Sequence, residues 1–233
     1  MPSAAVVVFA KLPEPGRVKT RLRGTLSPQQ AAELHRACLA DTVAAVARVP
    51  GCRKRLQVAS GIDAARELAA ALKLKHPWQV GVQRGRDLGE RLEQAFASLF
   101  GAGYRRVVIV GTDTPWMGSR RIAHALELLD AADAVLGPTE DGGYYLVGAH
   151  QLYKPMFRGI PWSTSQVFDR TLGALQKVHA RYRLLPRDFD LDRPEDLGRA
   201  AELLGQDATR APALARLLKK MKGDAVSRSS RRR

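Results

Sequence analysis

The sequence is poor in cysteine and lacks long hydrophobic stretches. Two cysteines among 233 residues, Cys38 and Cys52, are too few for a disulfide framework or a cysteine-based zinc site. No stretch approaches the roughly 20 apolar residues that span a bilayer, so no membrane contact is expected. The amino terminus shows neither a basic leader nor a small-residue cleavage site. These absences predict a cytoplasmic protein, in a compartment where thiols stay reduced.

Acidic residues are also scarce, because 38 Lys and Arg face only 23 Asp and Glu, a formal charge of +15. The last fifteen residues carry seven basic residues and one aspartate, a net of +6, in a tail whose end is expected to be disordered. The excess indicates either nucleic-acid binding or a basic tail combined with a site for anionic ligands. Aromatic residues, at 6%, do not interleave with the basic ones, which counts against single-strand binding. A non-catalytic nucleic-acid-binding module that uses the tail and surface is therefore the alternative function, with weak, salt-sensitive contacts.

Short β-branched runs alternate with longer helical patterns along the chain. Strands are expected at about 4–10, 55–60, 78–83, 105–112, 133–138, 143–149 and 181–186. Helices are expected at about 28–48, 63–73, 88–100, 119–130, 163–179 and 194–205, with Ser27 and Asp87 as N-caps of the first and third. This alternation predicts a three-layer α/β/α sandwich whose sheet is mostly parallel, with a mixed portion at the closely spaced strands of 133–149. One domain over 1–207 and a basic tail over 208–233 are expected.

The loop after the first strand gathers cations where a parallel sheet binds ligands, at the carboxyl end of a strand. It offers Lys11, Gly16, Arg17, Lys19, Thr20 and Arg21. The cations can neutralise a polyphosphate, and glycine permits close backbone approach. The spacing matches neither the P-loop nor the dinucleotide-binding glycine pattern. An ordinary solvated basic turn remains the alternative.

The segment GTDTP (111–115) follows the most strongly hydrophobic strand directly. That strand brings Asp113 to the carboxyl edge of the sheet, a suitable position for a carboxylate that holds Mg²⁺ or Mn²⁺ beside phosphates. The alternative is that Asp113 caps the helix that follows. We favour the metal role because of the position at the sheet edge.

Two later segments add carboxylates. EDGGYY (140–145) is either a plain hairpin turn or a site at which an acceptor approaches the backbone. In DFDLDRPEDL (188–197), Asp190 and Asp192 point to the same side of an extended segment, so one of them could complete a metal site with Asp113. The same segment starts a helix at its Arg-Pro-Glu-Asp portion.

The motifs FAKLPEPGRVKTRL, DLGERL, GTDTPWM, GPTEDGGYYLVG, PWST and DFDLDRPEDL, in this order, resemble a bacterial family of glycosyltransferase-A-like proteins. That family is related to the molybdenum-cofactor guanylyltransferases and the 2-phospholactate guanylyltransferases. The resemblance spans about residues 4–205 and implies a nucleotide-diphospho-sugar transferase fold. It implies nucleotide contacts from the first loop and from DLGERL, through Lys11, Gly16, Lys19, Arg21, Asp87, Gly89 and Arg91.

The resemblance also implies a metal site at Asp113 and Asp192, with Asp190 as the alternative to Asp192. The acceptor would face Glu140, Asp141, Gly142 and Gly143. The expected function is metal-dependent transfer from a nucleotide-activated donor to a small-molecule acceptor, in which Lys19, Arg21 and Asp113 are catalytic. The opening loop departs from the glycine-rich loop of related nucleotidyltransferases, so the donor stays open between a nucleoside triphosphate and a nucleotide sugar.

Overall fold

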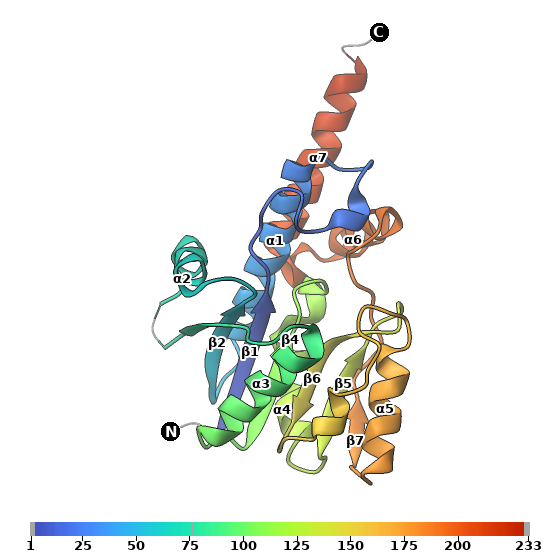
Figure 1. Cartoon of the computed structure of the whole chain (residues 1–233). Coiled ribbons are helices and arrows are strands. Elements are labelled where there is room, and N and C mark those ends of the chain that lie inside the picture. Colours follow the sequence, from blue (N-terminus) through green and yellow to red (C-terminus); the bar gives the residue numbers. More distant parts are fainter. Residues whose placement is uncertain (1–2, 76, 231–233) are drawn as a thin grey trace.

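A computed structural model describes residues 3–75 and 77–230 of the chain. Its strands form one sheet of seven, in the order β3-β2-β1-β4-β6-β5-β7 (Figure 1). The strands are β1 (Ala4–Ala10), β2 (Cys52–Val58), β3 (Gln79–Val82), β4 (Arg106–Val110), β5 (Ala134–Pro138), β6 (Tyr144–Ala149) and β7 (Tyr182–Leu184). The helices are α1 (Pro28–Ala47), α2 (Ile62–Ala71), α3 (Leu88–Gly101), α4 (Gly118–Leu128), α5 (Val167–Lys177), α6 (Pro194–Gln206) and α7 (Pro212–Ser230). Short 3-10 turns are η1 (Thr20–Leu22), η2 (Pro115–Met117), η3 (Lys154–Met156) and η4 (Ala208–Arg210).

The sheet has a parallel part and a mixed part, which confirms the predicted arrangement. Strands β3, β2, β1 and β4 run parallel, with Val6 opposite Lys54 and Val108. Strand β6 is antiparallel to both β4 and β5, and β7 runs parallel to β5. The start of β6 therefore lies at the same edge as the end of β4, where the Gly111 amide donates to the Tyr145 carbonyl at 2.9 Å.

Alternation along β1 explains the three layers, because successive strand residues point to opposite faces. Val6 and Val8 pack into a core with residues of α1, α2 and α4. Ala5 and Val7 pack into a second core on the other face, with residues of α3 and α5. The helix starts follow local signals, as at Ser27, whose side chain caps α1 in a capping box with Gln30.

A third hydrophobic cluster lies beyond the carboxyl edge of the sheet and joins α1, α6 and α7. It contains Leu22, Leu34, Cys38, Trp116, Leu191, Ala200, Leu204, Ala211 and Leu214. Ala211 and Leu214 are fully buried, so the first part of the predicted tail 208–233 is packed into the fold. Helix α7 continues to Ser230 and extends away from the body (Figure 1), and residues 231–233 of the predicted tail lie outside the described residues.

The structure also shows where the two cysteines lie and whether any helix could span a membrane. Both cysteines are buried and free, and each sits among apolar neighbours. Within residues 3–75 and 77–230, none of the helices has the length and apolar character required to cross a bilayer.

Candidate active site

Four segments that are far apart in the sequence meet at the carboxyl edge of the parallel strands. They are the loop after β1 (11–27), the segment after β4 (111–114), the turn between β5 and β6 (139–143) and the segment after β7 (185–193). Backbone hydrogen bonds join them, since the Leu191 amide donates to the Asp113 carbonyl at 2.8 Å and the Glu140 amide donates to the Asp188 carbonyl at 3.0 Å. The basic loop and the acidic segments therefore share one site.

A buried lysine joins the first loop to the central strand. The Lys19 ammonium lies 2.5 Å from Asp113 Oδ1 and also donates to the Leu191 carbonyl. The Lys19 side chain is only 2% exposed, whereas that of Asp113 is 45% exposed. Lys19 also adopts a left-handed backbone conformation, with φ of 50°, which is uncommon for a residue with a side chain. Its contacts hold it there, so Lys19 positions Asp113 and leaves one face of that carboxylate open.

Charge interactions keep this pair ionised. Burial alone would lower the pKa of Lys19, but the neighbouring Asp113 carboxylate raises it well above the usual range. Burial opposes ionisation of Asp113, yet Lys19 holds the pKa of that carboxyl below its ordinary value. Asp113 does not cap the following helices, because η2 and α4 have no side-chain cap. The capping alternative for Asp113 is thereby removed.

A second carboxylate, Asp190, lies near Asp113, and no cationic side chain among the described residues forms an ion pair with it. The Thr114 hydroxyl donates to Asp190 Oδ1 at 2.7 Å, and Thr114 is the chain neighbour of Asp113. Burial, followed by the charge of Asp113, raises the pKa of Asp190 to about 7. The two carboxylates therefore interact with each other, and Lys19 neutralises their charge only in part.

Asp192 occupies a different place from Asp190, although both belong to the DFDLD segment. Its Oδ2 accepts from Arg21 at 2.8 Å, so the predicted metal ligand Asp192 and the predicted catalytic Arg21 form an ion pair. The Arg21 side chain is 51% exposed. Arg21 therefore keeps donors directed to solvent at the edge of the site.

The rest of the first loop presents cations outward. Lys11, Arg17 and Arg23 are exposed, and the Arg23 guanidinium donates to the Gly16 carbonyl at 3.1 Å. Gly16 has φ of 77°, a conformation that glycine adopts without strain. Of the predicted phosphate-binding residues, Lys11, Gly16 and Arg21 are accessible and Lys19 is buried behind them.

The predicted acceptor residues build the turn between β5 and β6. Asp141 Oδ1 accepts from the Thr139 hydroxyl at 2.6 Å and from the Gly143 amide at 3.1 Å. Both oxygens of Glu140 accept from Arg199, at 2.8 and 2.9 Å. These contacts give the two carboxylates structural partners, and their role towards an acceptor stays a prediction.

The backbone conformation and close packing at position 142 require a glycine, which accounts for one of the two glycines of the EDGG motif. Gly142 has φ of +86°, and a β-carbon there would lie 2.0 Å from the Ser165 carbonyl oxygen. Gly142→Ala is expected to destabilise the protein by at least about 2 kcal/mol, because strain and a backbone clash combine. Urea unfolding measures this loss. The control is Gly173→Ala in α5, where a β-carbon meets nothing within 4 Å and alanine favours the helix. Equal losses of stability in the two variants would contradict the clash at Gly142.

The DLGERL segment also has local structural roles. Asp87 caps α3 by accepting from the Glu90 amide at 2.8 Å, as predicted, and Arg91 Nε donates to the Gly85 carbonyl at 3.1 Å. Gly89 lies against Trp162, so that a β-carbon would sit 2.2 Å from the indole nitrogen. A nucleotide role for Asp87, Gly89 and Arg91 remains a prediction.

Sequence reasoning missed a polar group beneath the site. One oxygen of Asp188 accepts from Trp116 Nε1 at 2.9 Å, and the other lies 2.5 Å from the Arg121 guanidinium. Trp116 is 2% exposed, and its ring lies 4.5 Å from that of Phe189. The group fixes the chain immediately before Asp190. The only sequence signal was a tryptophan next to GTDTP, which does not identify its partner.

The donor set of the site fits a divalent cation bound together with phosphates. Among the described residues, no three His, Cys, Asp or Glu side chains are arranged to hold a metal by themselves. Mg²⁺ commonly takes only one or two protein carboxylates and completes its shell with phosphate oxygens and water. Asp113 and Asp190 supply such a pair, and within the described part of the chain no ion pair occupies Asp190.

Comparisons with known proteins agree with this geometry. The family model described as "Uncharacterized protein conserved in bacteria (DUF2064)" matches residues 42–164. A 2-phospho-L-lactate guanylyltransferase from Methanothermobacter thermautotrophicus is 30% identical over 185 residues, which cover 77% of each chain. The similarity to this relative confirms the predicted resemblance and the assignment to the transferases.

Solved structures confirm the fold. A protein from Desulfovibrio desulfuricans G20 that is assigned as a nucleotide-diphospho-sugar transferase superposes with a TM-score of 0.89, at 31% identity over 98% of both chains. A 4-diphosphocytidyl-2C-methyl-D-erythritol synthase from Anaerococcus prevotii shares the fold, with a TM-score of 0.59 at 10% identity over 87% of this chain and 97% of that one. Taken with the family match over residues 42–164, these similarities show that the chain belongs to the DUF2064 family of bacterial proteins.

Proposed function

We propose that the protein is a metal-dependent nucleotidyltransferase, which moves a nucleoside monophosphate from a nucleoside triphosphate to a small acceptor and releases pyrophosphate. The observation that carries the proposal is the pair of carboxylates Asp113 and Asp190 beside the buried Lys19, at the foot of a loop of exposed cations. The guanylyltransferase relative supports nucleotidyl transfer over glycosyl transfer.

In this proposal Asp113 and Asp190 would hold Mg²⁺ or Mn²⁺. Asp190 replaces Asp192 as the second ligand because Asp192 is engaged by Arg21. The bound cation would offset charge on the phosphate oxygens of the donor. Lys19 keeps Asp113 ionised and fixes its direction through the second contact with Leu191.

The exposed cations would bind the remaining phosphate oxygens. Arg21 is held in place by Asp192 and retains free N–H donors, which suits a planar guanidinium at a pyrophosphate leaving group. Lys11 and Arg17 lie on the same loop and add charge at the entrance. The acceptor would enter from the turn at 139–143, which shares the edge of the sheet with Asp113.

Phosphorus NMR of the products tests the proposal. The purified protein is incubated with each of the four common nucleoside triphosphates, Mg²⁺ or Mn²⁺, and a set of phosphorylated hydroxy acids and sugar phosphates. We expect inorganic pyrophosphate in amounts equal to a new phosphodiester or diphosphate signal, and none when EDTA replaces the metal. Release of a nucleoside diphosphate from nucleotide sugars, with no turnover of triphosphates, would instead establish glycosyl transfer and overturn the proposal.

A further inference from the structure

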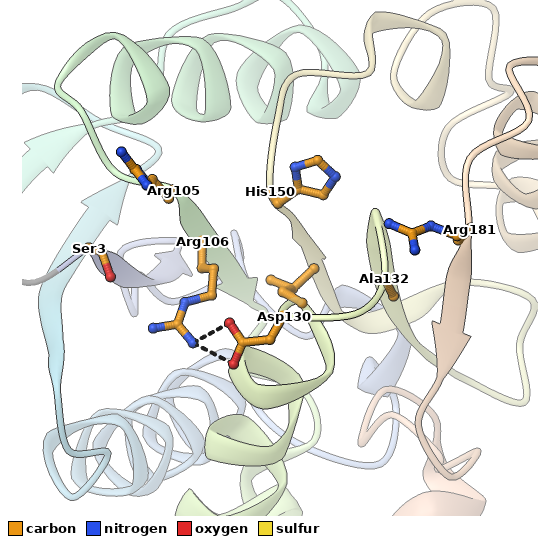
Figure 2. A pocket seen from close by; sticks show the side chains of 8 residues that line it. Ser3, Arg105, Arg106, Asp130, Ala132, His150 and Arg181 are labelled. Atoms are coloured by element: carbon orange, nitrogen blue, oxygen red, sulfur yellow. Dashed lines mark hydrogen bonds and ion pairs between the residues drawn. The ribbon is translucent and has the colours of Figure 1, made fainter.

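A pocket of about 450 Å³ opens at the opposite edge of the sheet, away from the candidate active site (Figure 2). It lies where β1 and β4 begin and where β6 ends. Its charged and polar lining includes Ser3, Arg105, Arg106, Asp130, His150 and Arg181. Strand β4 runs from this pocket to Asp113, and about seven extended residues put roughly 20 Å between the two sites. The volume falls within the range of small-molecule sites, about 300–1,000 Å³.

Three arginines and the carboxylate of Asp130 line the pocket, and a second carboxylate, Asp133, lies behind its wall and holds Arg181 and His150 in place. Asp133 accepts from the Arg181 amide at 2.7 Å, from Arg181 Nε at 3.2 Å and from His150 Nε2 at 2.7 Å. The Asp133 side chain is only 15% exposed, so this carboxylate supports the wall of the pocket. Ordered cationic side chains lose little conformational entropy when an anion binds.

The other two arginines have unused donors. Arg106 contacts both oxygens of Asp130 through Nη1 alone, at 2.8 and 3.0 Å. Among the described residues, the remaining donors of Arg106 and the whole guanidinium of Arg105 have no partner. Asp130 is 64% exposed, and an ion pair of such exposure contributes only about 0–1 kcal/mol. An incoming anion can therefore displace Asp130 from Arg106 at little cost.

We propose that this pocket binds a small phosphate-bearing anion, with Asp130 now lying where one anionic oxygen of the ligand would lie. In Figure 2, the Arg106–Asp130 pair lies between Ser3 and Arg105 on one side and His150 and Arg181 on the other. In the same view the Arg105 guanidinium points away from Arg106, so Arg106 is the group that would bind the anion directly and the other basic side chains would add positive charge around it. The site is independent of the proposed nucleotidyl transfer, whose residues lie at the other edge.

Titration of the ¹⁵N-labelled protein with inorganic pyrophosphate, in EDTA, tests the site. We expect saturable amide shifts at Arg105, Arg106, Asp130 and Arg181. Arg105→Glu should weaken binding about tenfold, since it reverses an exposed charge that makes no internal contact. Asp130→Ala should tighten binding at least threefold because it frees Arg106, and a gain of affinity cannot result from misfolding. The control Arg66→Glu on α2 makes the same charge reversal elsewhere and should change affinity less than twofold.

Two results would overturn the proposal. One is a set of amide shifts confined to Gly16, Lys19 and their neighbours, which would place all binding at the active-site edge. The other is equal weakening by Arg105→Glu and Arg66→Glu, which would show general attraction to a basic protein.

Discussion

Replacing Asp113 by alanine is expected to weaken the binding of a nucleoside triphosphate with Mg²⁺ by at least about a hundredfold, or about 2.7 kcal/mol. The variant removes the open carboxylate face at the centre of the site and leaves the Lys19 ammonium, 2% exposed, without its counter-ion. We therefore also expect a loss of about 2–4 kcal/mol in unfolding free energy, towards the lower end for broken buried pairs because Asp113 is partly exposed. Calorimetry and urea unfolding measure the two effects.

A double variant separates binding from stability. Lys19→Met combined with Asp113→Ala removes the stranded charge, so it should regain most of the lost stability but none of the nucleotide affinity. Recovery of affinity in the double variant would show that Asp113 contacts neither metal nor nucleotide. If Asp113→Ala alone binds nucleotide and metal like the wild type, the metal assignment is wrong.

The ion pair also predicts how stability depends on pH. The pKa of Asp113 is lowered in the folded state, so its contribution is present above the unfolded pKa, about 3.9, and is lost as the pH falls through the folded value. The pKa of Lys19 is raised, so its contribution is present below about 10.4 and is lost at higher pH. The stability difference between the wild type and the double variant should thus be largest between about pH 4 and pH 10.

Asp188→Ala is expected to lower the unfolding free energy by about 3–5 kcal/mol. The substitution leaves Arg121, 20% exposed, without its carboxylate and leaves the buried Trp116 indole N–H without an acceptor. For a chain of this size the melting temperature should fall by roughly 10 °C. Calorimetric titration with Mn²⁺ should also show weaker binding, because Asp188 fixes the chain that carries Asp190.

Two controls accompany Asp188→Ala. Asp188→Asn keeps an acceptor for Trp116 and should lose less stability than the alanine variant. Asp63→Ala breaks an exposed pair with Arg66, in which the Asp63 side chain is 87% exposed, and should cost less than about 0.5 kcal/mol. A loss as small for Asp188→Ala as for Asp63→Ala would contradict the supporting role of Asp188.

Local sequence patterns were sufficient to predict the strands and helices of the fold. The β-branched run of β4 and the alternation with helical patterns predicted the parallel sheet, because burial on both faces demands such residues. The capping residues Ser27 and Asp87 were found because a cap and its target lie three residues apart. The edge position of Asp113 followed from the strand that precedes it.

Long-range contacts within the site could not be predicted in the same way. Lys19, Arg21 and Arg23 give equal local signals, and the contacts with Asp113 and Leu191, 94 and 172 positions later, distinguish the buried lysine. The alternation of DFDLD put Asp190 and Asp192 on one side, but their partners Thr114 and Arg21 come from different loops. Pairings of this kind depend on the folded arrangement and leave no pattern in the nearby sequence.

The contact between α1 and α7 bears on the order in which the chain can assemble during synthesis. The Asp41 carboxylate of α1 accepts from the Ala213 and Leu214 amides at 2.9 and 2.8 Å. These amides are synthesised after all seven strands, the last of which ends at Leu184, so the apolar side of α1 around Leu34 lacks its α7 contacts until residues 213–214 have emerged from the ribosome. A chain that ends shortly after α6 would contain all seven strands but would expose the apolar surface of α1 that α7 covers. We expect such a chain to aggregate or to be degraded.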